Sequence, residues 1–173
     1  MSGLLHMYVG DGKGKSTAAL GLVLRAAGAG FRVLYCQFLK TEDSSELAAL
    51  SCLPGVTVMK SAPTDGFLFF MDNASRARAL SDTAARLEDV HTRMCSGEFD
   101  LVVLDEFLWL IDVVLNADDA CEFIRSRAPK CELVLTGGHA PDELIELADY
   151  VSNIQKVKHP FDNDTAARVG IEF

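Results

Sequence analysis

The stretch that most constrains the fold is a loop rich in glycine and lysine between two apolar segments. It reads Gly10-Asp11-Gly12-Lys13-Gly14-Lys15-Ser16-Thr17, after a short apolar run at 4–9 and before an Ala/Leu-rich segment at 18–27. Strand, glycine-rich loop and helix in this order are the context of a phosphate-binding loop. Glycines let backbone N–H groups converge on phosphate oxygens, and the helix adds its unpaired N–H groups and positive dipole end. We therefore expect residues 10–17 to bind phosphate groups.

The spacing within this loop departs from the usual pattern. Four residues normally separate the first glycine from the Gly-Lys pair, but Val9 stands at that first position and only three residues separate Gly10 from Gly14. Lys15 is expected to contact the phosphates and Ser16 to offer a hydroxyl to Mg²⁺. Lys13 is a second lysine inside the loop. A surface turn without a ligand is the other interpretation, which the flanking strand and helix disfavour.

An acid pair follows a strongly apolar segment later in the chain. Residues Phe99 to Leu104 are predicted to form a strand that delivers Asp105 and Glu106. A carboxylate at this place can bind the Mg²⁺ of a nucleotide directly or through water. Such a pair alone is weak evidence, but downstream of a phosphate loop it predicts a metal site made of Ser16, Asp105 and Glu106.

Apolar segments and helical segments alternate along the chain. Strands are expected near 4–9, 31–39, 56–60, 99–104, 132–136 and 150–154, and helices near 18–27, 46–53, 73–95, 107–115, 118–128 and 141–148. This alternation predicts an α/β fold with a mostly parallel sheet of about six strands and helices on both faces. Together with the loop it indicates a P-loop NTPase-like architecture, as one domain over residues 1–173.

Composition excludes several classes of protein. The 173 residues carry a net charge of −9, which argues against a general nucleic-acid partner. No apolar stretch reaches the roughly 20 residues that a membrane-spanning helix needs, and no signal-peptide pattern is visible. We expect a soluble, cytoplasmic protein without a membrane partner. The five cysteines form no CxxC pair, so buried free thiols are expected rather than zinc ligands or disulfides.

An aromatic segment at 61–72 allows two interpretations. It carries Phe67, Phe69 and Phe70 after a proline and a glycine. Composition alone favours packing in the core, because clustered phenylalanines are usually buried. The other interpretation is that these rings face a flat ligand.

Several segments together resemble the P-loop ATP:corrinoid adenosyltransferases, which make adenosylcobalamin. The resemblance covers nearly the whole chain in order. Its motifs are the shortened loop at 10–17, Gln37-Phe38-Leu39-Lys40, the acid strand Val102 to Glu106, Leu135-Thr136-Gly137, the helix Ala140 to Asp149, Lys158 to Phe161, and the ending Gly170 to Phe173.

The resemblance implies a reaction. A corrinoid substrate reduced to cobalt(I) attacks C5′ of the co-substrate ATP, and triphosphate leaves with Mg²⁺ bound. Lys15 is implied to stabilise the leaving group, and Phe67 and Phe69 to press on the corrinoid so that cobalt(II) loses its axial ligand. Gln37, Lys40 and His159 join the implied binding residues. No protein nucleophile or base is needed, because cobalt is the nucleophile.

The family also implies partners, and the chain departs from the family in three places. A homodimer is expected, with a reductase or reduced flavin as the electron donor. Many members have arginine at the position of Gly138, and tryptophan at that of Phe69. Longer members carry an N-terminal extension over the corrinoid. This sequence starts shortly before its first predicted strand, so we expect a more open corrinoid site or another cover.

Two rival functions remain. In an ordinary P-loop ATPase or phosphotransferase, Glu106 would position water or an acceptor hydroxyl and the γ-phosphate would leave. A nucleotide-sensing partner protein would bind ATP without turnover. The shortened loop counts against the first, and the match of both loop and tail against the second.

Overall fold

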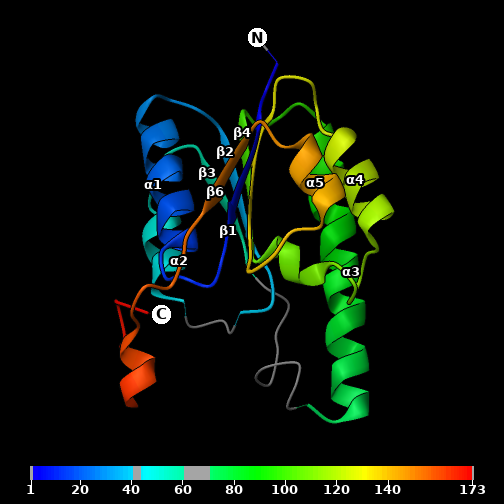
Figure 1. Cartoon of the computed structure of the whole chain (residues 1–173). Helices are drawn as coiled ribbons and strands as arrows, with labels where there is room; N and C mark the ends of the chain where they lie inside the picture. The colour runs from blue at the N-terminus through cyan, green and yellow to red at the C-terminus, as the bar shows by residue number, and fades with distance from the viewer. Residues whose placement is uncertain (1, 41–43, 61–70, 173) are drawn as a thin grey trace.

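The computed structural model describes residues 2–40, 44–60 and 71–172, and its centre is one parallel sheet. The six strands lie in the order β3-β2-β4-β5-β1-β6, and every neighbouring pair is parallel (Figure 1). This confirms the predicted α/β class. The strands are β1 Leu5–Val9, β2 Val33–Gln37, β3 Val56–Met59, β4 Leu101–Asp105, β5 Glu132–Thr136 and β6 Tyr150–Asn153.

Helices cover both faces of the sheet. Helices α1 and α2 lie on one side and α3, α4 and α5 on the other (Figure 1). Their bounds are α1 Lys15–Gly28, α2 Ser45–Leu50, α3 Asn73–Cys95, α4 Ala117–Arg125 and α5 Asp142–Leu147, with short 3₁₀ helices η2 Phe107–Leu110 and η3 Pro160–Asn163.

Two cores form because alternate residues of each strand point to opposite faces. In β2, Val33 and Tyr35 pack with α1 and α2, whereas Leu34 and Cys36 pack with residues of α3 and α4. All five residues of β2 are buried. A strand covered on both faces must be apolar throughout, which explains its near-continuous apolar sequence.

The strand order determines how the functional segments meet. Strand β5 lies between β1, which leads into the phosphate loop, and β4, which ends at Asp105. Because the strands are parallel, the residues after β1, β4 and β5 emerge at the same edge of the sheet. Ligand sites of parallel α/β sheets form at this edge.

The predicted helix from Phe107 to Leu115 is wrong. Only the single turn η2 is helical, and it is followed by a turn closed by a bridge between Ile111 and Leu115. Asp112 takes a left-handed conformation with φ 65°, which an α-helix cannot contain. The segment is apolar because Phe107, Leu108, Leu110 and Ile111 are buried in the core although they do not form a continuous helix.

The cysteine prediction is right in part. The thiols are free, and Cys36, Cys121 and Cys131 are buried. Cys52 and Cys95 are exposed, because they lie at the ends of helices where the chain leaves the core. Within the described ranges, no helix combines the length and the apolar character needed to cross a bilayer.

Candidate active site

The phosphate loop is held between two neighbouring segments of backbone. The N–H of Gly10 donates to the carbonyl of Gly138, which follows β5, at 3.0 Å. Gly10 has φ 112°, and a Cβ there would lie 2.3 Å from the carbonyl oxygen of Ile154. Only glycine meets both conditions, so this position fixes the path of the loop.

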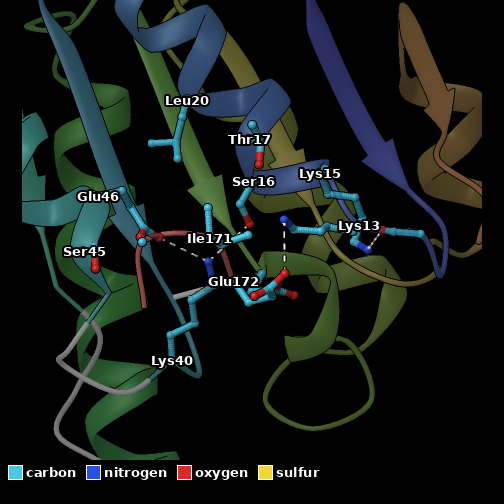
Figure 2. A pocket seen from close by; sticks show the side chains of 14 residues that line it. Lys13, Lys15, Ser16, Thr17, Leu20, Lys40, Ser45, Glu46, Ile171 and Glu172 are labelled. Atoms are coloured by element: carbon cyan, nitrogen blue, oxygen red, sulfur yellow. Dashed lines mark hydrogen bonds and ion pairs between the residues drawn. The ribbon is translucent and has the colours of Figure 1, made fainter. Parts of the chain in front are cut away.

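A hollow of about 650 Å³ opens above the loop (Figure 2). Its floor is Gly12 to Thr17, and further lining residues come from α1, from the segment after β2, from α2, from the residue after β4 and from the C-terminal tail. These are Leu20, Lys40, Ser45, Glu46, Glu106, Gly170, Ile171 and Glu172. The lining thus carries the lysines of the loop and Lys40 on the one hand and three glutamates on the other.

The two loop lysines are held in different ways. The ammonium of Lys15 donates to the carbonyl of Gly12 at 2.9 Å, within the loop. The ammonium of Lys13 lies 3.5 Å from the carboxylate of Glu172 in the tail (Figure 2). Both residues line the hollow.

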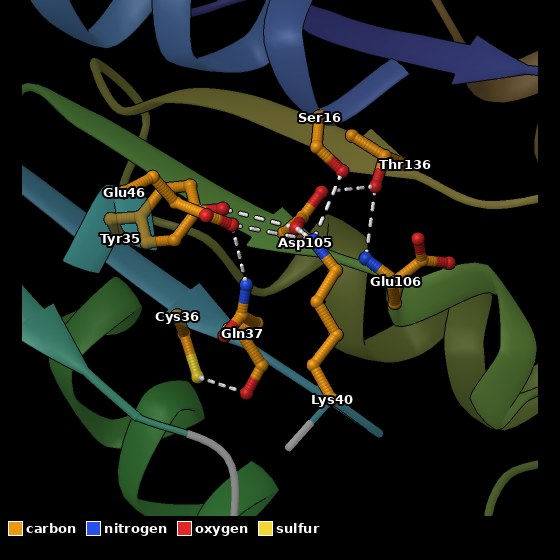
Figure 3. Close-up of polar contacts among 9 residues, drawn as sticks. All are labelled: Ser16, Tyr35, Cys36, Gln37, Lys40, Glu46, Asp105, Glu106 and Thr136. Atoms are coloured by element: carbon orange, nitrogen blue, oxygen red, sulfur yellow. Dashed lines mark hydrogen bonds and ion pairs between the residues drawn. The ribbon is translucent and has the colours of Figure 1, made fainter. Parts of the chain in front are cut away.

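At the edge of the hollow, the buried carboxylate of Asp105 contacts several polar side chains (Figure 3). Asp105 is fully buried; its Oδ2 lies 2.6 Å from the Lys40 ammonium and accepts from the Tyr35 hydroxyl at 3.0 Å, and its Oδ1 accepts from Thr136 at 2.7 Å. Burial opposes its charge, but the Lys40 ammonium and the hydroxyls of Thr136 and Ser16 hold the pKa of Asp105 below its usual range. Asp105 is therefore an ionised group whose oxygens are already engaged.

Lys40 links the phosphate loop to the acids. Its ammonium also lies 3.2 Å from the Ser16 hydroxyl and 3.6 Å from the Glu46 carboxylate. Burial works against the charge of Lys40, yet Asp105 and Glu46 raise its pKa overall. Lys40 is thus a permanent cation beside the loop.

Glu106 presents a second carboxylate in a different setting. It takes a left-handed conformation with φ 63°, and its N–H donates to the Thr136 hydroxyl at 2.9 Å. Its carboxylate lines the hollow. Burial and then the neighbouring Asp105 raise the pKa of Glu106, against the effects of Lys40 and Lys15. A strained conformation that aims a carboxylate into a pocket indicates a functional role.

The oxygen donors at the hollow are suited to hold a metal ion only together with oxygens of a bound ligand. The described residues contain no cluster of three or more His, Cys, Asp or Glu side chains that could hold an ion by themselves. The Ser16 hydroxyl and the Glu106 carboxylate are hard oxygen donors of the kind that Mg²⁺ accepts alongside phosphate oxygens.

Comparison with known families identifies the chain. The profile described as ATP:corrinoid adenosyltransferase BtuR/CobO/CobP matches residues 1–173. The chain belongs to this family. Membership makes it a transferase with ATP and a corrinoid as substrates, as the sequence resemblance implied, and supports this function over the two rivals.

Individual relatives agree with this assignment. The corrinoid adenosyltransferase of Escherichia coli K12 is 31% identical over 175 residues, which cover 99% of this chain and 86% of that protein. That of Pseudomonas aeruginosa is 32% identical over 172 residues, covering 99% and 84%. An uncharacterized Nostoc protein is 31% identical over 182 residues, and the match spans 92% of this chain but only 46% of that longer protein.

The adenosyltransferase brings most predicted site residues together, but not all. Asp11, Gln37 and His159 lie apart from the lining of the hollow. The Asp11 carboxylate accepts from the N–H of Lys156, the Gln37 amide donates to Glu46 at 3.0 Å, and His159 Nδ1 accepts from the N–H of Phe161. These contacts brace the tail, α2 and η3. Phe67 and Phe69 lie outside the described residues.

Sequence reasoning missed the supporting residues of the acid pair. Tyr35 and Thr136 donate to Asp105, and Glu46 contacts Gln37 and Lys40. In the sequence alone these three supporting residues look like ordinary core or helix residues. The structure also shows what lies beside Gly138, the position at which many family members have arginine. A Cβ there would lie 2.4 Å from the Trp109 ring, so the indole occupies the space beside this glycine.

Proposed function

We propose that the hollow holds the triphosphate of ATP and leaves C5′ open to the reduced corrinoid. The cobalt(I) electron pair forms a cobalt–carbon bond, the bond between C5′ and its ester oxygen breaks, and both electrons of that bond leave with triphosphate. The observation that carries this proposal is the gathering of Lys13, Lys15 and Lys40 around one loop. Asp105 already neutralises Lys40 and Glu172 contacts Lys13, so Lys15, which contacts a backbone carbonyl, is the cation most available to a polyphosphate leaving group whose charge grows in the transition state.

The described lining of the hollow supports a reaction without a protein nucleophile. It contains no cysteine or histidine, and two of its carboxylates, Glu46 and Glu172, are paired with lysines. In this proposal Lys15 and the loop N–H groups stabilise the leaving group, and the enzyme acts by positioning and charge.

We further propose that Mg²⁺ contacts Ser16 and Glu106. Bound there, the ion would neutralise charge on the triphosphate. Asp105 belongs to the same predicted metal site, and we assign it a supporting part because Lys40, Tyr35 and Thr136 already engage its oxygens. It would orient Ser16 and Lys40 or reach the ion through water.

Phe67 and Phe69 keep their proposed role on the strength of the family resemblance. Rigid apolar rings against the corrin face would exclude an axial ligand from cobalt(II) and so ease its reduction. Phe67→Ala and Phe69→Ala should impair transfer that starts from cobalt(II) more than transfer that starts from cobalt(I). Equal losses in both assays, with a large drop in melting temperature, would indicate core packing instead.

Assembly, electron donor and location are also proposals. A homodimer is supported by the edge strand β6, where the apolar side chains of Tyr150 and Val151 are about half exposed. Light scattering over a range of concentrations tests it. A reductase or reduced flavin would supply the electron that cobalt(II) needs, and we propose the cytoplasm as the location.

The decisive experiment is anaerobic incubation with chemically reduced cobalamin, Mg²⁺ and ATP. We expect the spectrum of adenosylcobalamin and one triphosphate per product by phosphorus NMR. Formation of ADP and orthophosphate without corrinoid would favour the ATPase function instead.

A further inference from the structure

Trp109 is an exposed tryptophan in a turn whose other side chains are buried. In η2, Phe107, Leu108 and Leu110 are almost fully buried, whereas Trp109 is 51% exposed. An indole that stays in water does not give the favourable free energy that burial of so large an apolar side chain would contribute to folding. The turn therefore presents this ring outward although it buries its neighbours.

The indole ring of Trp109 lies directly against the backbone of Gly138. A Cβ at Gly138 would lie 2.4 Å from Cζ2 and 2.7 Å from Cη2 of Trp109, so the benzene edge of the indole rests on bare backbone. That same Gly138 carbonyl accepts from the Gly10 N–H of the phosphate loop. The indole is thus attached to the strand end that supports the loop.

The ring lies beside the nucleotide hollow rather than in it. Trp109 is three residues after Glu106, its N–H donates to the Glu106 carbonyl at 3.2 Å, and its side chain interacts with the Glu106 carboxylate. Glu106 lines the hollow and Trp109 does not. A ligand that fills the hollow therefore leaves the indole available to a second molecule at the rim.

We propose that Trp109 is a corrinoid-contacting residue, which supports the macrocycle at the rim of the hollow. A corrin is broad and flat with apolar faces, and a rigid indole offers it a large apolar surface at a small entropic cost. The indole has no lone pair that would coordinate cobalt. This inference rests on the corrinoid transfer proposed above and adds a residue that binds the second substrate.

The chain offers a site-specific test, because Trp109 is its only tryptophan. Quenching of its fluorescence by acrylamide measures how exposed the ring is. Saturating Mg²⁺ and ATP should leave this quenching unchanged. A clear fall would mean that the nucleotide covers the ring, and would overturn the proposal.

The second test measures the KM of each substrate with chemically reduced cobalamin. Trp109→Ala should raise the corrinoid KM about tenfold and leave the ATP KM within about twofold, since an aromatic anchor acts on the molecule that it touches. Trp109→Phe should recover part of the loss. Phe31→Ala is the matched control and should change neither KM. It removes a ring that is 46% exposed and lies just before β2, at the amino end of that strand, whereas the hollow lies at the carboxyl ends.

The outcomes separate this proposal from the function on which it rests. A wild type that neither binds nor adenosylates cobalamin overturns both. If the wild type works but the Trp109 variants keep its corrinoid KM, only the role of Trp109 is overturned. A matching rise in the ATP KM, with no recovery in Trp109→Phe, would show that the ring acts through Glu106 and would also overturn it.

Discussion

The ammonium of Lys40 lies 2.6 Å from the buried carboxylate of Asp105 and 3.2 Å from the hydroxyl of Ser16. A cation therefore stands between the loop hydroxyl and the acid strand. The contact exists because β2 and β4 are neighbours and pair Gln37 with Asp105, so the residues after both strands meet at one edge. Lys40 thus neutralises the charge of Asp105 within the chain itself, which supports our proposal that Glu106 is the carboxylate that contacts Mg²⁺.

Replacing Lys40 by methionine should destabilise the protein by about 3 kcal/mol, the lower end of the range for breaking a buried pair. The lower part applies because Lys40 is 25% exposed and Asp105 keeps two hydroxyl donors. Chemical denaturation measures the change. The exposed pair of Lys156 and Asp162 is the control, and Lys156→Met should leave the free energy of unfolding close to that of the wild type, because exposed ion pairs contribute little. Equal losses in both variants would contradict the account.

The same variant should shift acid unfolding. The folded-state pKa of Asp105 is lowered, so this group adds stability above its unfolded pKa of about 3.9, and the stability is lost as the pH falls through the folded value. Without Lys40 the folded pKa rises, and the unfolding midpoint should move to higher pH. A midpoint that stays at the wild-type pH would count against the pairing.

Lys15→Ala should lower adenosyl transfer by at least roughly 10²-fold, a typical loss for one preorganised charge contact. Lys15 stands at the start of α1 and donates to the Gly12 carbonyl, from where it can turn to the phosphates. Lys13→Ala should cost less, because Lys13 is more exposed and contacts the tail. Transfer within a few-fold of wild type in Lys15→Ala would refute its role.

Glu106 should set an acid limit of the reaction. Its pKa is raised, chiefly by burial, so the carboxylate takes up a proton at a higher pH than an ordinary glutamate as the pH falls. A protonated Glu106 is a poor metal ligand, and transfer should decline at that pH. Glu106→Gln should raise the Mg²⁺ concentration required and remove this limit from the profile of kcat/KM against pH. A profile that keeps the same acid limit in the variant would exclude Glu106 as its source.

Local sequence signals predicted the elements, whereas the contacts between them needed the topology. The phosphate loop was predictable because Gly10 to Thr17 form one continuous segment. Lys40 and Asp105 are 65 positions apart, and their meeting depends on the pairing of β2 with β4. Glu46 looked like an ordinary acid in the first turn of a helix, and only the fold brings it to Lys40. The error at Phe107–Leu115 has the same origin, since an apolar run does not reveal whether one face or several are buried.

Gly10→Ala should disrupt the loop. The substitution demands φ 112° from a residue with a side chain and brings its Cβ within 2.3 Å of the backbone oxygen of Ile154. We expect ATP binding to weaken by about tenfold or more and the protein to lose about 1–3 kcal/mol of stability. Gly21→Ala is the control: within α1 a Cβ there meets nothing within 4 Å, so it should stabilise the helix by roughly 0.5–1 kcal/mol. Unchanged ATP affinity in Gly10→Ala would show that the loop does not need this conformation.

Glu172 places a carboxylate in the hollow that is proposed to bind the triphosphate. A hydrogen bond from Arg168 lowers its pKa to about 2, so it is ionised at neutral pH. It lies 3.5 Å from the Lys13 ammonium and lines the same hollow (Figure 2). In the proposed binding mode, an incoming triphosphate would compete with Glu172 for Lys13 and be repelled by its charge.

Glu172→Gln removes this competitor and keeps the shape of the side chain. We expect the KM of ATP to fall by about two- to fivefold at low salt, in keeping with a partly exposed ion pair. The gain should shrink as ionic strength rises, because salt screens the repulsion. Glu122→Gln on the exposed face of α4 changes the net charge equally and should leave the KM unchanged. A rise in the KM of Glu172→Gln would mean that the tail carboxylate helps to hold the nucleotide, and would contradict the competition.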